Sequence, residues 1–175
     1  MVDIKEVAEN IFLIDNQLYS IPNWGSVYLI NEERKALVDT GPTTSVNSVL
    51  DGIRKIGVKP EDINYIIITH IHLDHAGGAG ALIKNTPQAE VVVHQKSAKH
   101  LVNPERLVDS FVATMGEHMM AKIGPVVPVE KERMKPVQDG EIIVLSDAQK
   151  LRLLDMPGHA AHQLCIHESR NNGIF

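Results

Sequence analysis

Cysteine, aromatic residues and long apolar runs are all scarce in this chain of 175 residues. The only cysteine, Cys165, cannot form an internal disulfide, so the fold does not depend on a disulfide framework and a reducing compartment is expected. No stretch approaches the roughly 18–20 apolar residues that span a bilayer, and charged residues interrupt positions 1–15, where a signal peptide would lie. We therefore expect a cytoplasmic protein without a membrane segment.

The chain also lacks a basic excess. Its 17 Lys and Arg against 22 Asp and Glu give a formal net charge of -5, which argues against nucleic acid as the main partner and favours a small-molecule substrate. The hydrophobic share of 43% and the charged share of 22% are typical of a globular protein. The length predicts a single domain over residues 1–175.

Apolar patterning predicts a layered α/β protein, because strands alternate with helices and are followed by further strands. The expected helices lie at about 44–56, 78–84 and 104–123. The expected strands cover residues 4–7, 11–15, 26–30, 35–39, 65–69, 90–94, 141–145, 150–156 and 163–168.

Histidine is abundant, with nine in the chain, and its densest cluster follows the apolar run at 65–69. Residues two apart in an extended segment point the same way, so His70 and His72 can reach one metal ion. Asp74 and His75 follow as the chain turns and can reach a second position. These residue types suit zinc, and also iron or manganese. The alternative is that the histidines only cap the strand or lie in solvent.

The interpretation of three further residues depends on this cluster. Pro157 and Gly158 predict a turn that directs His159 toward His70 and His72, although the turn alone indicates only surface structure. His162 either has a direct role, hydrogen-bonds near the site or is exposed. Asp39 ends a strand beside a glycine turn; next to a metal site we expect it to hold the histidine loop by hydrogen bonds rather than to bind metal.

Residues 70–75 resemble the His-x-His-x-Asp-His signature of the metallo-β-lactamase-fold hydrolases. Residues 38–41 resemble the first motif of that superfamily and residues 157–159 its third, and the run 75–80 is similar to the group around glyoxalase II, lactonases and thioesterases. The resemblance implies a four-layer αβ/βα sandwich with a metal site at the edge between two sheets. It further implies metal binding by His70, His72, Asp74, His75 and His159.

The resemblance also implies that the domain is incomplete at its C-terminus. The family has a metal-bridging aspartate in the next strand and a later histidine, whereas here only the start of a strand, residues 174–175, follows the turn at 172–173. We therefore expect the N-terminal half to two-thirds of the sandwich. An exposed sheet edge would then favour a homo-oligomer or domain swapping.

These features predict a metal-dependent hydrolase. A metal-bound hydroxide would attack an ester, thioester, lactone or amide carbonyl, with one or two zinc ions and with Asp74 as the catalytic carboxylate that holds the metal or accepts the proton. One alternative is an iron-dependent relative that oxidises persulfides. Another is a non-catalytic metal-binding fragment.

Several residues have two interpretations or a simple default. Trp24 either covers an apolar substrate or packs in the core. Met115, Met119 and Met120 either fill the core or form part of a helical wall beside the site. His94, His100, His118 and His167 are expected at the surface, and Cys165 in a buried strand.

Overall fold

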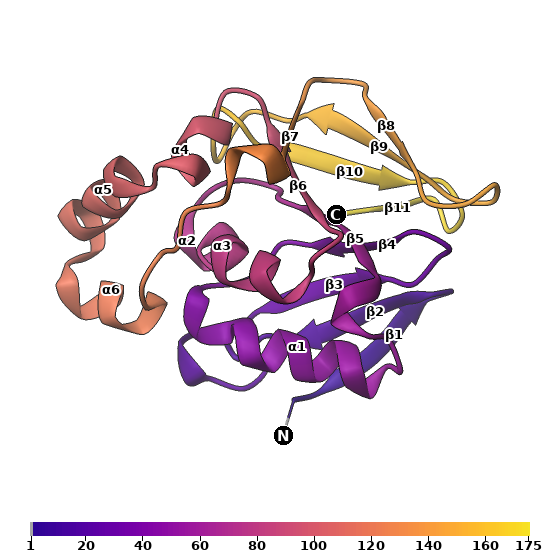
Figure 1. Cartoon of the computed structure of the whole chain (residues 1–175), viewed down its shortest axis with the longest axis horizontal. Helices are drawn as coiled ribbons and strands as arrows, with labels where there is room; N and C mark the ends of the chain where they lie inside the picture. The colour runs from indigo at the N-terminus through magenta and orange to yellow at the C-terminus, as the bar shows by residue number, and fades with distance from the viewer. Residues whose placement is uncertain (1) are drawn as a thin grey trace.

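The computed structural model describes residues 2–175 and contains two β-sheets packed face to face (Figure 1). The larger sheet has seven strands in sequence order. They are β1 (Ile4–Ala8), β2 (Ile11–Asp15), β3 (Ser26–Ile30), β4 (Lys35–Val38), β5 (Ile63–Ile67), β6 (Glu90–His94) and β7 (Met134–Val137). Strands β1 to β4 pair antiparallel, and β4 to β7 pair parallel.

The smaller sheet is antiparallel and has the order β11-β10-β9-β8. Its strands are β8 (Ile142–Val144), β9 (Lys150–Asp155), β10 (Leu164–Glu168) and β11 (Gly173–Ile174). The short β11 confirms the return strand that the 172–173 turn predicts, since Ile174 pairs with His167.

Helices connect the parallel strands and cover the outer face of the larger sheet. The α-helices are α1 (Val46–Lys55), α2 (Leu73–Ala76), α3 (Ala79–Leu82), α4 (Ala98–Val102), α5 (Glu105–Met115) and α6 (Glu117–Ile123). Short 3-10 helices lie at Leu18–Ser20, Thr43–Ser45, Pro60–Asp62, Ile83–Asn85 and Lys131–Arg133. Figure 1 shows α4 to α6 together at one side of the two sheets. No helix within residues 2–175 is long and apolar enough to cross a membrane.

Side-chain alternation along the strands gives the protein two apolar cores. On β4, Leu37 belongs to the core between the larger sheet and its helices, whereas Val38 belongs to the core between the sheets. On α1, Val49 and Ile53 are fully buried in the helix-side core. The α/β prediction is confirmed, and the described residues supply helices, a large sheet and a small sheet as successive layers.

Two predicted elements differ from the structure. The helix expected at 104–123 is two helices, because Gly116 adopts a φ of 82° that a helix cannot continue through. Strand β7 is absent from the prediction, since Pro136 weakens its strand signal; β7 is an edge strand of the larger sheet, where proline is tolerated.

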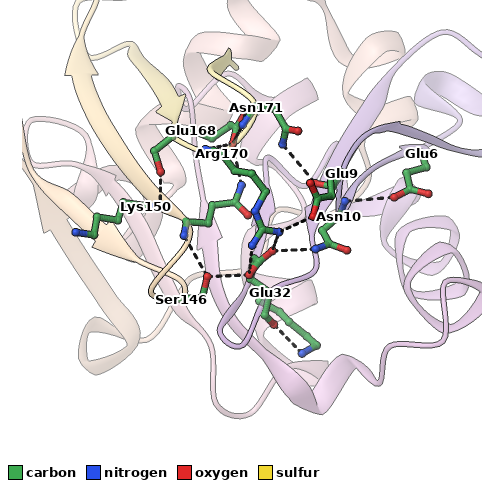
Figure 2. Close-up of polar contacts among 12 residues, drawn as sticks. Glu6, Glu9, Asn10, Glu32, Ser146, Lys150, Glu168, Arg170 and Asn171 are labelled. Atoms are coloured by element: carbon green, nitrogen blue, oxygen red, sulfur yellow. Dashed lines mark hydrogen bonds and ion pairs between the residues drawn. The ribbon is translucent and has the colours of Figure 1, made fainter.

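A polar cluster joins the turns of the two sheets (Figure 2). Glu32, in the β3–β4 turn, pairs with Arg170 in the β10–β11 turn. The Ser146 hydroxyl donates a hydrogen bond of 2.8 Å to the Glu32 carboxylate, and the side-chain amide of Asn10 donates another of 3.0 Å. Because β4 begins beside Glu32 and ends beside Asp39, this cluster lies at the opposite end of the sandwich from the histidines.

Candidate metal centre

The ends of two parallel strands position the histidine loop. Asp39 follows β4 with a φ of 62°, and Thr69 lies just beyond β5. The Thr69 amide donates to Asp39 Oδ1 at 2.8 Å, and the Thr40 amide donates to the carbonyl of His75 at 2.8 Å. These bonds fix the segment between them at the carboxyl edge of the sheet.

The structure brings His70, His72 and His159 together. Each offers a ring nitrogen, and these three atoms all lie within 4.8 Å of one another. Nδ1 of His72 is 2.9 Å from Nε2 of His159, although the two residues are 87 positions apart. His70 and His72 come from the loop after β5 of the larger sheet, whereas His159 comes from the β9–β10 loop of the smaller one. The site therefore spans both sheets.

The hydrogen bonds of His70 leave one ring nitrogen without a partner. The Thr69 hydroxyl donates to Asp39 at 2.9 Å, so it accepts from Nδ1 of His70, 3.1 Å away. Nε2 of His70 then carries the lone pair, and this atom is buried without a hydrogen-bond partner. A buried imidazole whose other nitrogen is held through a hydroxyl to a carboxylate has the form of a metal ligand. The donor set thus fits a divalent ion.

Burial and neighbouring imidazole charges favour the neutral forms of His70 and His72. Burial, followed by the neighbouring imidazole charges, lowers the pKa of His70 to about 3. Burial and the charge of His159 also lower the pKa of His72. Neutral imidazole is the form that binds metal, so the environment favours ligation at neutral pH.

Asp74 and His75 lie beside the three-histidine cluster. The ring of His75 is centred 4.1 Å from that of His70, and its Nε2 is 3.5 Å from Asp74 Oδ2. Its Nδ1 is 2.8 Å from Asp39 Oδ2. Burial lowers the pKa of His75, but the hydrogen bond and charge of Asp39, with the charge of Asp74, raise it more and give a net increase. The predicted role of Asp39 as a hydrogen-bonding support is confirmed.

Two further histidines hold the loop that carries His159. His162 Nε2 accepts the Ile71 amide at 3.2 Å, which links the loop to the backbone between His70 and His72. The prediction of a surface position for His94 is wrong: it is 2% exposed and its Nε2 lies 3.2 Å from Asp155 Oδ1 at the end of β9. His94 is the last residue of β6, and this position at a strand end was the sequence signal that could have predicted its burial near the site.

Two cavities flank the cluster. One of about 560 Å³ runs between the sheets and includes His70, His75 and Cys165 in its lining. The other, of about 290 Å³, lies on the side of His72 and Asp74.

The core interpretation of Trp24 is wrong, since its side chain is 64% exposed. Cys165 is half-buried, and none of Met115, Met119 and Met120 is buried in the core. His118 is exposed, as predicted.

Comparison with known proteins agrees with this geometry. Residues 23–175 match the metallo-beta-lactamase superfamily domain. An N-acyl homoserine lactonase from Bacillus cereus is 35% identical, over 99% of this chain and 68% of its own length. The acyl-coenzyme A thioesterase MBLAC2 of Bos taurus is 23% identical, over 98% of this chain and 63% of its own.

Solved structures show the same fold. A metallo-beta-lactamase from Cronobacter sakazakii superposes with a TM-score of 0.76 at 22% identity, over 99% of this chain and 62% of that one. The chain thus spans about two-thirds of the lactonase and less of the solved lactamase. The matched domain, the fold and the order of the motifs agree: this chain belongs to the metallo-beta-lactamase superfamily.

Proposed function

We propose that the protein is a metal-dependent hydrolase of ester, lactone, thioester or amide bonds, with His70, His72 and His159 as metal ligands. The observation that carries the proposal is the convergence of three imidazole nitrogens within 4.8 Å, one of them buried and unpaired. The lactonase and thioesterase relatives support the hydrolytic chemistry.

A divalent ion at this site would polarise the substrate carbonyl and lower the pKa of water toward about 7. The side chains around it have separate roles. Asp74 is about one-third exposed and lines the smaller cavity, so it is placed to accept the proton of the attacking water. His75 is a candidate ligand for a second ion. Its hydrogen bond to Asp39 orients its ring toward Asp74.

We propose zinc as the resident metal, because three neutral imidazoles are a ligand set typical of catalytic zinc. Asp74 and His75 would contribute to a second ion. Iron and manganese also accept these ligands, so the metal must be measured.

The test is elemental analysis of the purified chain together with hydrolysis of an uncharged lactone and thioester. We expect about one metal per chain at the three-histidine site. His70→Ala and His72→Ala should lose both metal and activity, whereas the exposed His118→Ala should retain both. Unchanged activity in a metal-free His70→Ala protein would overturn the proposal.

The two rival functions give different results in the same experiment. Iron in place of zinc, with oxygen consumption on a persulfide and no hydrolysis, would indicate the oxidative function. Bound metal without turnover of either substrate would indicate a metal-binding fragment.

The partner proposals depend on charge and on sheet edges. A net charge of -5 favours a small molecule over nucleic acid. The short edge strand β11 and the exposed Ile174 beside the larger cavity support a homo-oligomer. The lone Cys165 supports a reducing, cytoplasmic location. Sedimentation of the purified chain tests the oligomeric state.

A further inference from the structure

One wall of the smaller cavity, of about 290 Å³, is formed by residues of the histidine loop. His72 and Asp74 form the part of its lining that belongs to the site. The opposite lining includes Leu107, Phe111 and Met115 of α5, and Tyr19 from the β2–β3 connection. The cavity therefore joins polar, metal-ligating groups directly to an apolar surface.

Helix α5 presents an apolar face that the protein core covers only in part, at Leu107. Leu107, Phe111 and Met115 recur every four residues, so they share one side of the helix. Such a stripe normally packs into the core, yet no residue of α5 is buried and Met115 is 50% exposed. All three side chains also line the cavity.

Tyr19 is held at the cavity by a strained backbone. Its φ of 57° and ψ of 25° lie in the left-handed region, which bulky residues rarely adopt. Gln17 and Ser20 also have positive φ. Asp15 fixes the segment, because its carboxylate accepts the amides of Gln17 at 2.9 Å and Asn23 at 3.0 Å. Strain that the surroundings maintain in this way is typical of residues that position a ligand.

We propose that this cavity binds the uncharged acyl chain of the substrate, with the scissile carbonyl at the histidine cluster. The inference rests on the proposed hydrolase function and names its substrate class. The cavity is continuous with His72 and Asp74, and Asp74 is its only charged lining residue. An apolar chain is therefore favoured, and a chain that ends in a carboxylate is repelled. The volume suits a chain of medium length rather than a bulky polar acyl group.

The first test is a series of uncharged acyl thioesters from about four to about twelve carbons. Burial of each methylene should raise kcat/KM about fourfold until the cavity is full, after which the rise stops. Phe111→Ala should flatten this dependence. Val112→Ala, on the same helix but outside the cavity, should leave it unchanged. Ser110→Phe, which fills the cavity, should move the preference to shorter chains.

The second test measures binding without turnover. Calorimetric titration of hexanamide, octanamide and decanamide into the 175-residue chain should show tighter binding as the chain lengthens. This trend should be lost in Phe111→Ala and kept in Val112→Ala. An amide of the same length with a terminal carboxylate should bind more weakly. Because no residue of α5 is buried, these variants should fold normally.

The outcomes separate the two proposals. Hydrolysis that is independent of chain length, or equal loss in Phe111→Ala and Val112→Ala, would overturn the acyl-chain inference and leave the hydrolase function standing. Length-dependent binding of the amides without hydrolysis of any thioester or lactone would support the cavity's preference and overturn the hydrolase function instead.

Discussion

Asp39 Oδ2 lies 2.8 Å from Nδ1 of His75, while Oδ1 of the same carboxylate accepts the Thr69 amide at 2.8 Å. One side chain, about one-tenth exposed, thereby orients both ends of the histidine loop. Through the Thr69 hydroxyl it also determines which nitrogen of His70 is free. Asp39 consequently controls the geometry of the site without belonging to the three-histidine cluster.

Replacing this carboxylate should weaken metal binding. In Asp39→Asn, His75 loses the charge that raises its pKa and the Thr69 hydroxyl loses its strong acceptor. Loss of such supporting partners reduces metal affinity by about 10- to 100-fold, which competition with a chromogenic chelator would measure. Asp51→Asn, in an exposed pair with Arg54, is the matched control. Equal affinities in the two variants would contradict this role.

His162 should stabilise the His159 loop as a hydrogen-bond acceptor. In His162→Ala the Ile71 amide loses its partner, at a cost of about 1–3 kcal/mol if it stays buried. His162→Gln keeps an acceptor and should recover part of this loss. Urea denaturation measures the stabilities, and metal titration shows whether His159 remains in place. Identical stability of both variants and the wild type would argue against the link.

The metal-free protein should lose stability as the pH falls below about 6.5. The pKa of His70 is lowered from 6.5 to about 3, so between these values the unfolded chain binds a proton that the folded chain does not. Burial lowers the pKa of His72 and of His162 as well, and both act in the same direction, whereas the raised pKa of His75 opposes them. Denaturation of chelator-treated protein across this range tests the slope. It should become shallower in His70→Asn; an unchanged slope would exclude His70 as the cause.

Breaking the Glu32–Arg170 pair should destabilise the contact between the sheets without altering the site. The Glu32 side chain is 7% exposed, so Arg170→Met leaves a nearly buried carboxylate with only the Ser146 and Asn10 bonds. We expect a loss of about 1–3 kcal/mol, measured by chemical denaturation. Arg54→Met, in an exposed pair, should change little. Reduced metal affinity in Arg170→Met would contradict the separation of this cluster from the metal site.

Sequence patterns predicted the features that depend on local spacing. The alternation of His70 and His72 predicted their shared direction, and the turn before His159, taken together with that motif, predicted that His159 joins them. The position of Asp39 beside the expected metal site predicted its hydrogen bonds to the histidine loop. The pairing of His70 with His72 was predictable because it depends on the backbone direction of a few consecutive residues.

Other features that depend on distant partners were not predicted. His94 is buried because Asp155, 61 residues away, meets it across the two sheets. Strand β7 forms because β6 supplies a parallel neighbour. For Met115 the sequence left two interpretations open, core filling or a helical wall beside the site, and the three-dimensional arrangement places it in the lining of a cavity beside the site.

The separation of 87 residues between His72 and His159 has a consequence for folding. A long loop must close before these imidazoles meet, and contacts of this kind form late because the chain entropy is lost first. The complete ligand set therefore exists only after the smaller sheet has docked on the larger one. Metal binding during refolding should therefore occur at the rate of the slowest folding phase. The time course of metal binding would then measure the docking of the two sheets.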